Sequence, residues 1–154
     1  MSDIGAVIGD HSGRAHTVLR YAQVVEQLVT AAKQPGFGAD GWAPLAELVD
    51  TGNFVRVGNF KEVMTWAEYT AFLTGWAPSA QWDCTFKRIT EHGDVVFLEL
   101  EERSAIGDFT SVVNSMSVYE FDAAGKITHI DVYLQMELPK PEMLAAYDGA
   151  DIAQ

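Results

Sequence analysis

The chain has 154 residues, of which 48% are apolar and 21% charged, as expected for one globular domain with a substantial core. Its 22 acidic residues outnumber 10 basic ones, and the formal charge of −12 argues against nucleic acids and anionic membranes as partners. The single cysteine, Cys84, excludes an internal disulfide framework, and no apolar run reaches the roughly 20 residues that cross a bilayer. We expect a cytoplasmic protein.

Residues 1–15 have no basic region before their short apolar run, so they do not resemble a signal peptide, and we expect a flexible tail. Residues 16–33 are predicted to form a helix, because apolar side chains recur at three- and four-residue steps. That apolar face comprises Val18, Tyr21, Val25, Leu28 and Ala32. A loop rich in glycine and proline then leads to a short helix at 42–50 and a short strand at 53–57.

A third helix is predicted to begin at Thr65, because Thr65 and Glu68 have the spacing of a capping box. Pro78 is expected to stop this helix. Its buried face would consist of Tyr69, Phe72, Leu73 and Trp76.

From residue 80 onward the pattern changes to alternating strands, which form a hairpin around the turn at 91–93. A three-residue loop would place Phe86 opposite Leu98, Cys84 opposite Leu100, and Trp82 opposite Glu102. This register separates the apolar side chains from the polar ones, which favours it. The apolar face would contain Trp82, Cys84, Phe86, Val96, Leu98 and Leu100.

Two further strands, 111–121 and 127–136, form a last hairpin with two possible registers. A three-residue loop pairs Ser117 with Asp131 and Tyr119 with His129, and so turns these polar groups inward. A β-bulge is a further way to turn Asp131 inward. A four-residue loop instead pairs Ser117 with Ile130 and Ser115 with Val132. It makes an apolar inner face of Ser115, Ser117, Tyr119, Ile130, Val132 and Leu134.

Three helices followed by a four-stranded antiparallel meander predict an α+β fold. The sheet has to bury its apolar face, and the N-terminal helices are the cover available. A curved antiparallel sheet wrapped on about three helices leaves a cone-shaped pocket. We expect one domain over residues 1–154, with flexible tails at 1–15 and 139–154.

This order of elements resembles the nuclear transport factor 2-like superfamily, also called the cystatin-like α+β cone. The superfamily includes ketosteroid isomerases, limonene-type epoxide hydrolases and SnoaL-type polyketide cyclases. The likeness spans residues 16–138 and is strongest over 112–134, with the F-D-x-x-G-K-I core of the isomerases' last hairpin. The resemblance implies the four-residue loop and an apolar pocket. It is specific for the fold and does not point to one activity, because members of the superfamily share the fold and little of the chemistry.

Compared with the isomerases, Leu19-Arg20-Tyr21 is similar to the stretch of the first helix that carries the pocket tyrosine. The resemblance therefore implies that Tyr21 donates a hydrogen bond in the pocket. The position of the general-base aspartate holds Arg56, and the position of the second acid holds Ser117. The isomerase acid–base set is not reproduced.

Compared with the epoxide hydrolases, whose Asp-Arg-Asp set activates water, Glu102 falls at one carboxylate position. The arginine position holds Leu100. The remaining carboxylate position holds Val132, and Asp131 is its neighbour in the sequence.

Four residues are candidates for catalysis: Tyr21, Arg56, Glu102 and Asp131. At the cavity mouth beside Trp82, a partly buried Glu102 suits acid–base work, because the aromatic ring disfavours the anion. Its alternative is an exposed charge paired with Arg103. Arg56 offers a fork of donors to a ligand oxygen, or forms a salt bridge. Tyr21 is either a pocket donor or a core tyrosine.

His129 and Asp131 lie two residues apart, so they share one face of their strand. They form either an acid–base pair or part of a dimer interface on the outer face of the sheet. We favour the interface. A homodimer is expected there, because the registers leave Phe97, Met116 and Val118 on that face.

The expected ligand is a hydrophobic small molecule. The sequence has no His/Cys/Asp cluster with metal spacing and no phosphate-binding glycine loop, so we expect no metal and no cofactor. We predict a cofactor-free isomerase, cyclase, dehydratase or epoxide hydrolase; a non-catalytic ligand-binding protein is the alternative. The predicted substrate-binding residues are Trp66, Tyr69, Trp76, Trp82, Leu100, Ser117, Tyr119, Val132 and Leu134.

Overall fold

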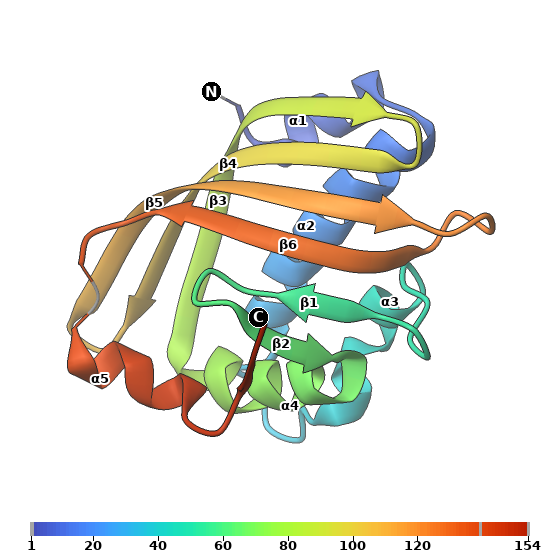
Figure 1. Ribbon diagram of the computed structural model, residues 1–154. Helices are drawn as coiled ribbons and strands as arrows, with labels where there is room; N and C mark the ends of the chain where they lie inside the picture. Colours follow the sequence, from blue (N-terminus) through green and yellow to red (C-terminus); the bar gives the residue numbers. More distant parts are fainter. Residues whose placement is uncertain (1, 139, 154) are drawn as a thin grey trace.

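The computed structural model describes residues 2–138 and 140–153 and contains one curved sheet with helices against its concave face (Figure 1). Within these residues the strand order is β3-β4-β5-β6-β1-β2-β7, and every pair is antiparallel except β1 with β6. The α+β fold with a curved sheet is confirmed. The strands are β1 Val55–Val57, β2 Glu62–Thr65, β3 Ala80–His92, β4 Val95–Ile106, β5 Phe109–Phe121, β6 Ile127–Gln135 and β7 Asp151–Ile152.

The described helices include the three predicted ones, with shorter elements at both ends of the chain. The α-helices are α1 Ile4–Val7, α2 Gly13–Ala31, α3 Ala43–Ala46, α4 Trp66–Trp76 and α5 Pro141–Leu144. The 3₁₀ turns are Ile8–Asp10, Ala39–Trp42, Ala77–Ser79 and Ala145–Tyr147. None of the described helices is both long enough and apolar enough to cross a membrane.

Helix α4 begins where its capping box predicts. The Thr65 hydroxyl accepts a hydrogen bond from the Glu68 amide at 3.3 Å, and the Glu68 carboxylate accepts one from the Thr65 amide at 3.0 Å. These two bonds satisfy amides that a helix start leaves without partners. The helix ends at Trp76, ahead of Pro78, as expected.

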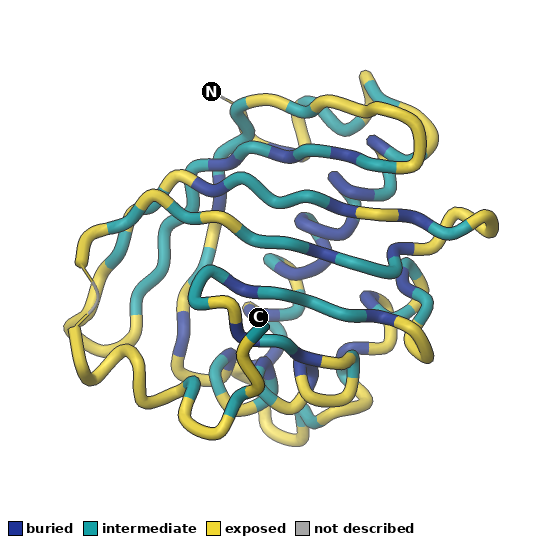
Figure 2. Tube along the Cα trace, in the orientation of Figure 1, coloured by how far each residue is buried: buried dark blue, intermediate teal, exposed yellow. Residues whose placement is uncertain are grey.

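The core lies between α2 and the concave face of the sheet, where the buried residues of Figure 2 gather. Helix α2 contributes the predicted apolar face, including the fully buried Val18, and β4 contributes Val96 and Leu98. The Lys33 ammonium group, just after α2, donates to the carbonyls of Val29 at 2.7 Å and Ala77 at 2.8 Å, and also to that of Ala80. One side chain therefore joins the end of α2 to the start of β3.

The hairpin of β3 and β4 has the predicted faces, but its predicted register is wrong by two residues. Phe86 pairs with Leu100, and Cys84 pairs with Glu102. The turn between His92 and Val95 has two residues, and the register shifts again at a bulge between Phe86 and Arg88. Because the total shift is even, the same side chains still face the core.

The hairpin of β5 and β6 has the apolar inner face of the four-residue-loop alternative, again with pairing shifted by two. Ser117 pairs with Val132, and Tyr119 pairs with Ile130, so the pairing of Ser117 with Asp131 is wrong. The register shifts at a bulge between Glu120 and Phe121. His129 and Asp131 therefore point to the convex face of the sheet.

Strands β2 and β7 are additions to the predicted sheet, and β1 takes an unpredicted place. β1 lies parallel to β6, with Arg56 beside Ile130, and antiparallel to β2. These strands are too short for their alternation to stand out in the sequence. Their arrangement carries Arg56 onto the concave face.

Both terminal segments contain regular structure where we expected flexible tails at 1–15 and 139–154. Ser2 forms a β-bridge with Phe86, and Ile4 is 2% exposed. Near the other end, the Tyr147 ring packs against Phe60 with centroids 5.2 Å apart, and β7 pairs with β2. Apolar side chains anchor both segments. Residues 1, 139 and 154 of these predicted tails lie outside the described residues.

Candidate functional site

A cavity of about 140 Å³ lies between α2 and the concave face of the sheet, as the predicted cone requires. Helix α2, strands β1 and β3 to β6 and helix α4 all contribute to its wall. The lining residues are Tyr21, Ala22, Val25, Arg56, Tyr69, Trp82, Leu100, Glu102, Ser117, Tyr119, Ile130, Val132 and Leu134.

Most of the predicted site residues line this cavity, including Tyr21, Arg56 and Glu102. The predicted list lacked Ala22, Val25 and Ile130, although Val25 and Ile130 were placed on the correct faces of their elements. Ala22 follows Tyr21 on the helix and has too small a side chain to signal a pocket.

Trp66, Trp76 and Asp131 are absent from the cavity wall. The Trp66 ring packs edge-on against Phe54 at 5.2 Å, and Trp76 packs partly buried against the core. Asp131 lies on the convex face, because it alternates with Ile130 and Val132, which face the cavity. The structure therefore brings Tyr21, Arg56 and Glu102 together and leaves Asp131 apart.

Glu102 extends from β4 into the cavity and is held by Trp82 of β3. Its Oε1 accepts a hydrogen bond from the Trp82 indole nitrogen at 2.9 Å. Arg103 turns to the other face of β4, where its guanidinium lies 3.0 Å from Glu101. The alternative that paired Glu102 with Arg103 is therefore wrong. Among the residues that line the cavity, Glu102 is the single carboxylate, which is too few to hold a metal ion.

Arg56 both lines the cavity and forms a salt bridge, so its two predicted roles coexist. Its Nη1 lies 3.9 Å from Oε1 of Glu62, and its Cζ lies 4.7 Å from the centroid of the Tyr69 ring. Burial lowers the pKa of Arg56, and the neighbouring phenols and the Glu62 carboxylate raise it by more. The guanidinium is therefore a permanently charged donor at the cavity.

Glu62 is a functional-site residue that the sequence did not reveal. It is 2% exposed, and its Oε2 accepts a hydrogen bond from the Phe60 amide at 2.9 Å. A carboxylate so deeply buried needs partners, and the amide and Arg56 supply them. In the sequence, this lone acid in a short segment is indistinguishable from a surface charge.

Tyr21 points its hydroxyl into the interior with no hydrogen-bond partner among the described residues. The residue is 4% exposed, and its ring meets Tyr119 edge-on at 5.7 Å. Burial raises the pKa of Tyr21 well above its usual value, and the Tyr69 and Tyr119 phenols add to this. The Tyr69 side chain interacts weakly with the Tyr21 hydroxyl, although no hydrogen bond of normal geometry joins them. A protonated hydroxyl without a well-formed hydrogen bond is available to donate to a ligand.

Comparison of the sequence with known protein families and with curated proteins gives no match. Solved structures do match, at low identity. An NTF2-like protein of unknown function from Cytophaga hutchinsonii is 13% identical, with a TM-score of 0.57 over 81% of this chain and 92% of that one. An LEH-like epoxide hydrolase from M. tuberculosis is 16% identical, with a TM-score of 0.56 over 75% and 82%. A steroid delta-isomerase from Pseudomonas aeruginosa is 15% identical, with a TM-score of 0.54 over 88% and 86%.

These likenesses show that the chain has the NTF2-like fold, which isomerases, cyclases and epoxide hydrolases share. The resemblance predicted from the last hairpin is confirmed at the level of the fold. Because identities this low carry no residue roles, the activity has to be argued from the cavity itself.

Proposed function

We propose that this protein catalyses cofactor-free acid–base chemistry on a compact hydrophobic substrate bound in the cone cavity. One observation carries the proposal: the cavity combines a single carboxylate, Glu102, with the partnerless hydroxyl of Tyr21 and the guanidinium of Arg56. A base and two oxyanion donors in an otherwise largely apolar site are the parts that such chemistry requires.

In the proposed reaction, Glu102 takes a proton from a carbon next to the substrate's carbonyl group. The electron pair of that C–H bond forms a new C=C bond, the π pair of the carbonyl group moves onto its oxygen, and this oxygen accepts hydrogen bonds from Tyr21 and Arg56. In a β,γ-unsaturated carbonyl compound the intermediate is a dienolate, and Glu102 returns the proton to the γ carbon, which moves the double bond into conjugation and completes an isomerisation without a cofactor. The hydrogen bond from Trp82 keeps the carboxylate oriented during both transfers.

The size of the cavity supports a compact substrate. Its volume of about 140 Å³ is below the roughly 300–1,000 Å³ of pockets that hold drug-sized ligands. Aliphatic and aromatic side chains form most of its wall. We therefore favour single-ring or short-chain carbonyl compounds over larger polycyclic ones.

A second candidate is non-catalytic binding of a hydrophobic ligand in the same cavity. Arg56 stands where the resemblance puts the isomerases' general base, and its charge is directed toward Glu62. Among the described residues that line the wall, Glu102 is the single carboxylate, so the wall offers no second one. This observation favours a carrier, which would keep its ligand unchanged.

The experiment begins with a panel of small cyclic ketones, enones and epoxides, screened by tryptophan fluorescence and melting temperature, because Trp82 lines the cavity. Absence of any response would contradict both candidate functions. Hits are then assayed for turnover and for Kd in the Glu102→Gln and Arg56→Met variants. The matched control is Glu101→Gln, one residue along β4 on the opposite face.

An enzyme should lose about 10²- to 10⁴-fold in rate in Glu102→Gln while Kd changes little, since the amide still accepts from Trp82. Arg56→Met should lower kcat through loss of an oxyanion donor. Glu101→Gln should behave as the parent protein. A ligand that binds without turnover in the parent protein supports the carrier instead. Turnover that is unchanged in Glu102→Gln would contradict the assigned base.

A further inference from the structure

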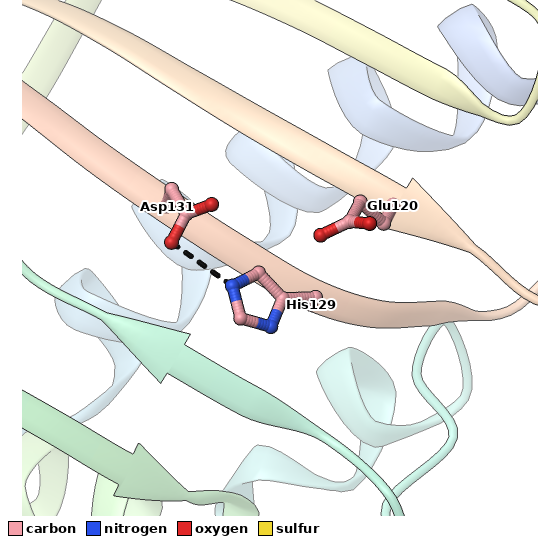
Figure 3. A group of neighbouring side chains, drawn as sticks. All are labelled: Glu120, His129 and Asp131. Carbon is pink, nitrogen blue, oxygen red and sulfur yellow. Dashed lines mark hydrogen bonds and ion pairs between the residues drawn. The ribbon is translucent and has the colours of Figure 1, made fainter. Parts of the chain in front are cut away.

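Three side chains that coordinate metals well converge on the convex face of the sheet, opposite the cavity. Figure 3 shows Glu120 on β5 and His129 and Asp131 on β6, with α2 behind the strands. Glu120 is the cross-strand partner of His129, and Asp131 follows two residues along the same strand. Side chains in these positions share a face and lie next to one another.

The distances within this group fit a common ligand. One donor atom from each residue lies within 4.8 Å of the other two, and His129 Nε2 is 2.9 Å from Asp131 Oδ1. The 2.9 Å contact is a hydrogen bond in the absence of metal. Two ligands about 2.1 Å from a tetrahedral ion are about 3.4 Å apart, so the pair would exchange this bond for the ion with a separation about 0.5 Å wider. Glu120 is exposed, and a rotation of its side chain would bring it in.

The charge around the group is unbalanced. Among the described residues, Asp131 pairs with His129 inside the group, and no lysine or arginine forms a salt bridge with Glu120 or Asp131. The neighbours of Asp131 on the flanking strands are Val118 and Val57. Two carboxylates beside valines, in a chain with a formal charge of −12, would be stabilised by a bound cation.

We propose that Glu120, His129 and Asp131 form a binding site for a divalent first-row transition metal, with Zn²⁺ as the expected occupant. One imidazole nitrogen and two carboxylate oxygens suit Zn²⁺, whereas Mg²⁺ and Ca²⁺ prefer oxygen ligands throughout. The strands that carry the ligands lie inside the sheet, between β4 and β1, so their backbones are fixed. The site faces away from the cavity and is independent of the function proposed there.

The test uses the full chain, stripped of metal with a chelator and titrated with Zn²⁺ in a calorimeter. We expect one Zn²⁺ per chain and much weaker binding of Mg²⁺. His129→Gln should weaken Zn²⁺ binding by at least the roughly 10- to 100-fold that changes around metal ligands cost. Glu120→Gln and Asp131→Asn should each weaken it as well. His92→Gln, at the exposed end of β3, is the matched control and should bind as the parent does.

Two further measurements test whether the metal binds at this site and whether each variant is folded. Co²⁺ bound in place of Zn²⁺ should give a visible absorption spectrum that His129→Gln lacks and His92→Gln retains. The melting temperature of each variant without metal shows whether the variant folds. The proposal is overturned if the parent protein binds no Zn²⁺, if His129→Gln binds it equally well, if His92→Gln loses it too, or if Mg²⁺ binds as tightly.

Discussion

Glu62 fills the space that a side chain on Gly58 would occupy. A β-carbon at residue 58 would lie 1.5 Å from Oε1 of Glu62 and 2.3 Å from its carboxyl carbon. Because this carboxylate stands behind Arg56, the absence of a side chain at residue 58 helps to place a charged group of the cavity. Glycine is required here to leave space for Glu62, since Gly58 is not among the glycines that adopt a left-handed φ.

Gly58→Ala should therefore destabilise the fold by about 1–3 kcal/mol, the usual effect of overpacking, and displace Glu62 from Arg56. Urea unfolding measures the stability change. Gly75→Ala is the control, because a β-carbon at residue 75 would meet nothing within 4 Å and alanine favours the helix. Equal stabilities of the two variants would contradict the close contact.

Tyr21→Phe should leave the free energy of unfolding unchanged or raise it by up to about 1 kcal/mol, because the lost hydroxyl makes no well-formed hydrogen bond to the described residues. For any cavity ligand with a carbonyl group, the same change should weaken binding or turnover roughly 10-fold, the effect of one hydrogen bond. Tyr147→Phe, outside both the cavity wall and the convex face of the sheet, is the control for both measurements. A large stability loss would mean that the Tyr21 hydroxyl does have a partner.

Burial raises the pKa of the Cys84 thiol from 9.0 to about 12, and the carboxylates of Glu26 and Glu102 add to the shift. Between these pH values the unfolded thiol has lost its proton and the folded one keeps it. Stability should therefore be fully present below about pH 9 and fall by up to about 1.4 kcal/mol per pH unit above it.

The Cys84→Ala variant should show a shallower decline of stability above about pH 9, measured by urea unfolding. The tyrosines are present in both proteins and should contribute equally to the decline in each. The native protein should also react slowly with a thiol reagent at pH 8, because the thiol is buried and protonated. A rapid reaction under native conditions would contradict the burial of Cys84.

We propose that the protein forms a homodimer through its convex face, where Phe97, Met116, Val118 and Tyr133 lie on adjacent strands. Sedimentation in the presence of a chelator should give about twice the chain mass of 16.9 kDa. Met116→Lys should weaken the dimer at least about 30-fold, as loss of a central contact does. Leu144→Lys, outside this patch, should not. A monomer at micromolar concentration would refute the proposal.

Local patterns in the sequence were enough for the helices and for the faces of β3 to β6. The three- and four-residue steps of 16–33 and the alternation of 81–134 each report which side of an element is buried. The exact pairings were wrong by two residues, because each turn differs in length from the expected one and a bulge near Phe86 or Glu120 shifts the register by one residue more. The net shift is even in both hairpins, so the alternation is kept. These errors changed which residues pair across the strands, but the same side chains still face the cavity.

Local patterns could not predict which distant segments would lie side by side in the fold. Nothing in the sequence around Arg56 shows that its strand will lie beside β6, and nothing marks Glu62 as buried. The partnerless state of the Tyr21 hydroxyl likewise depends on where the tyrosines of three different elements end up. Such features arise from the assembled fold, so a structure is needed to see them.

The parallel pairing of β1 with β6 also sets an order for assembly. Val57 of β1 pairs with Asp131 of β6, which is synthesised much later. Strand β1 therefore cannot pair with β6 until most of the chain has been made. A nascent chain can close the hairpins of β3, β4 and β5 earlier, because their contacts are local. The cavity wall at Arg56 is therefore completed last. Pulsed hydrogen exchange should show the Val57 amide gaining protection after the β3–β4 amides during refolding, and the reverse order would contradict this.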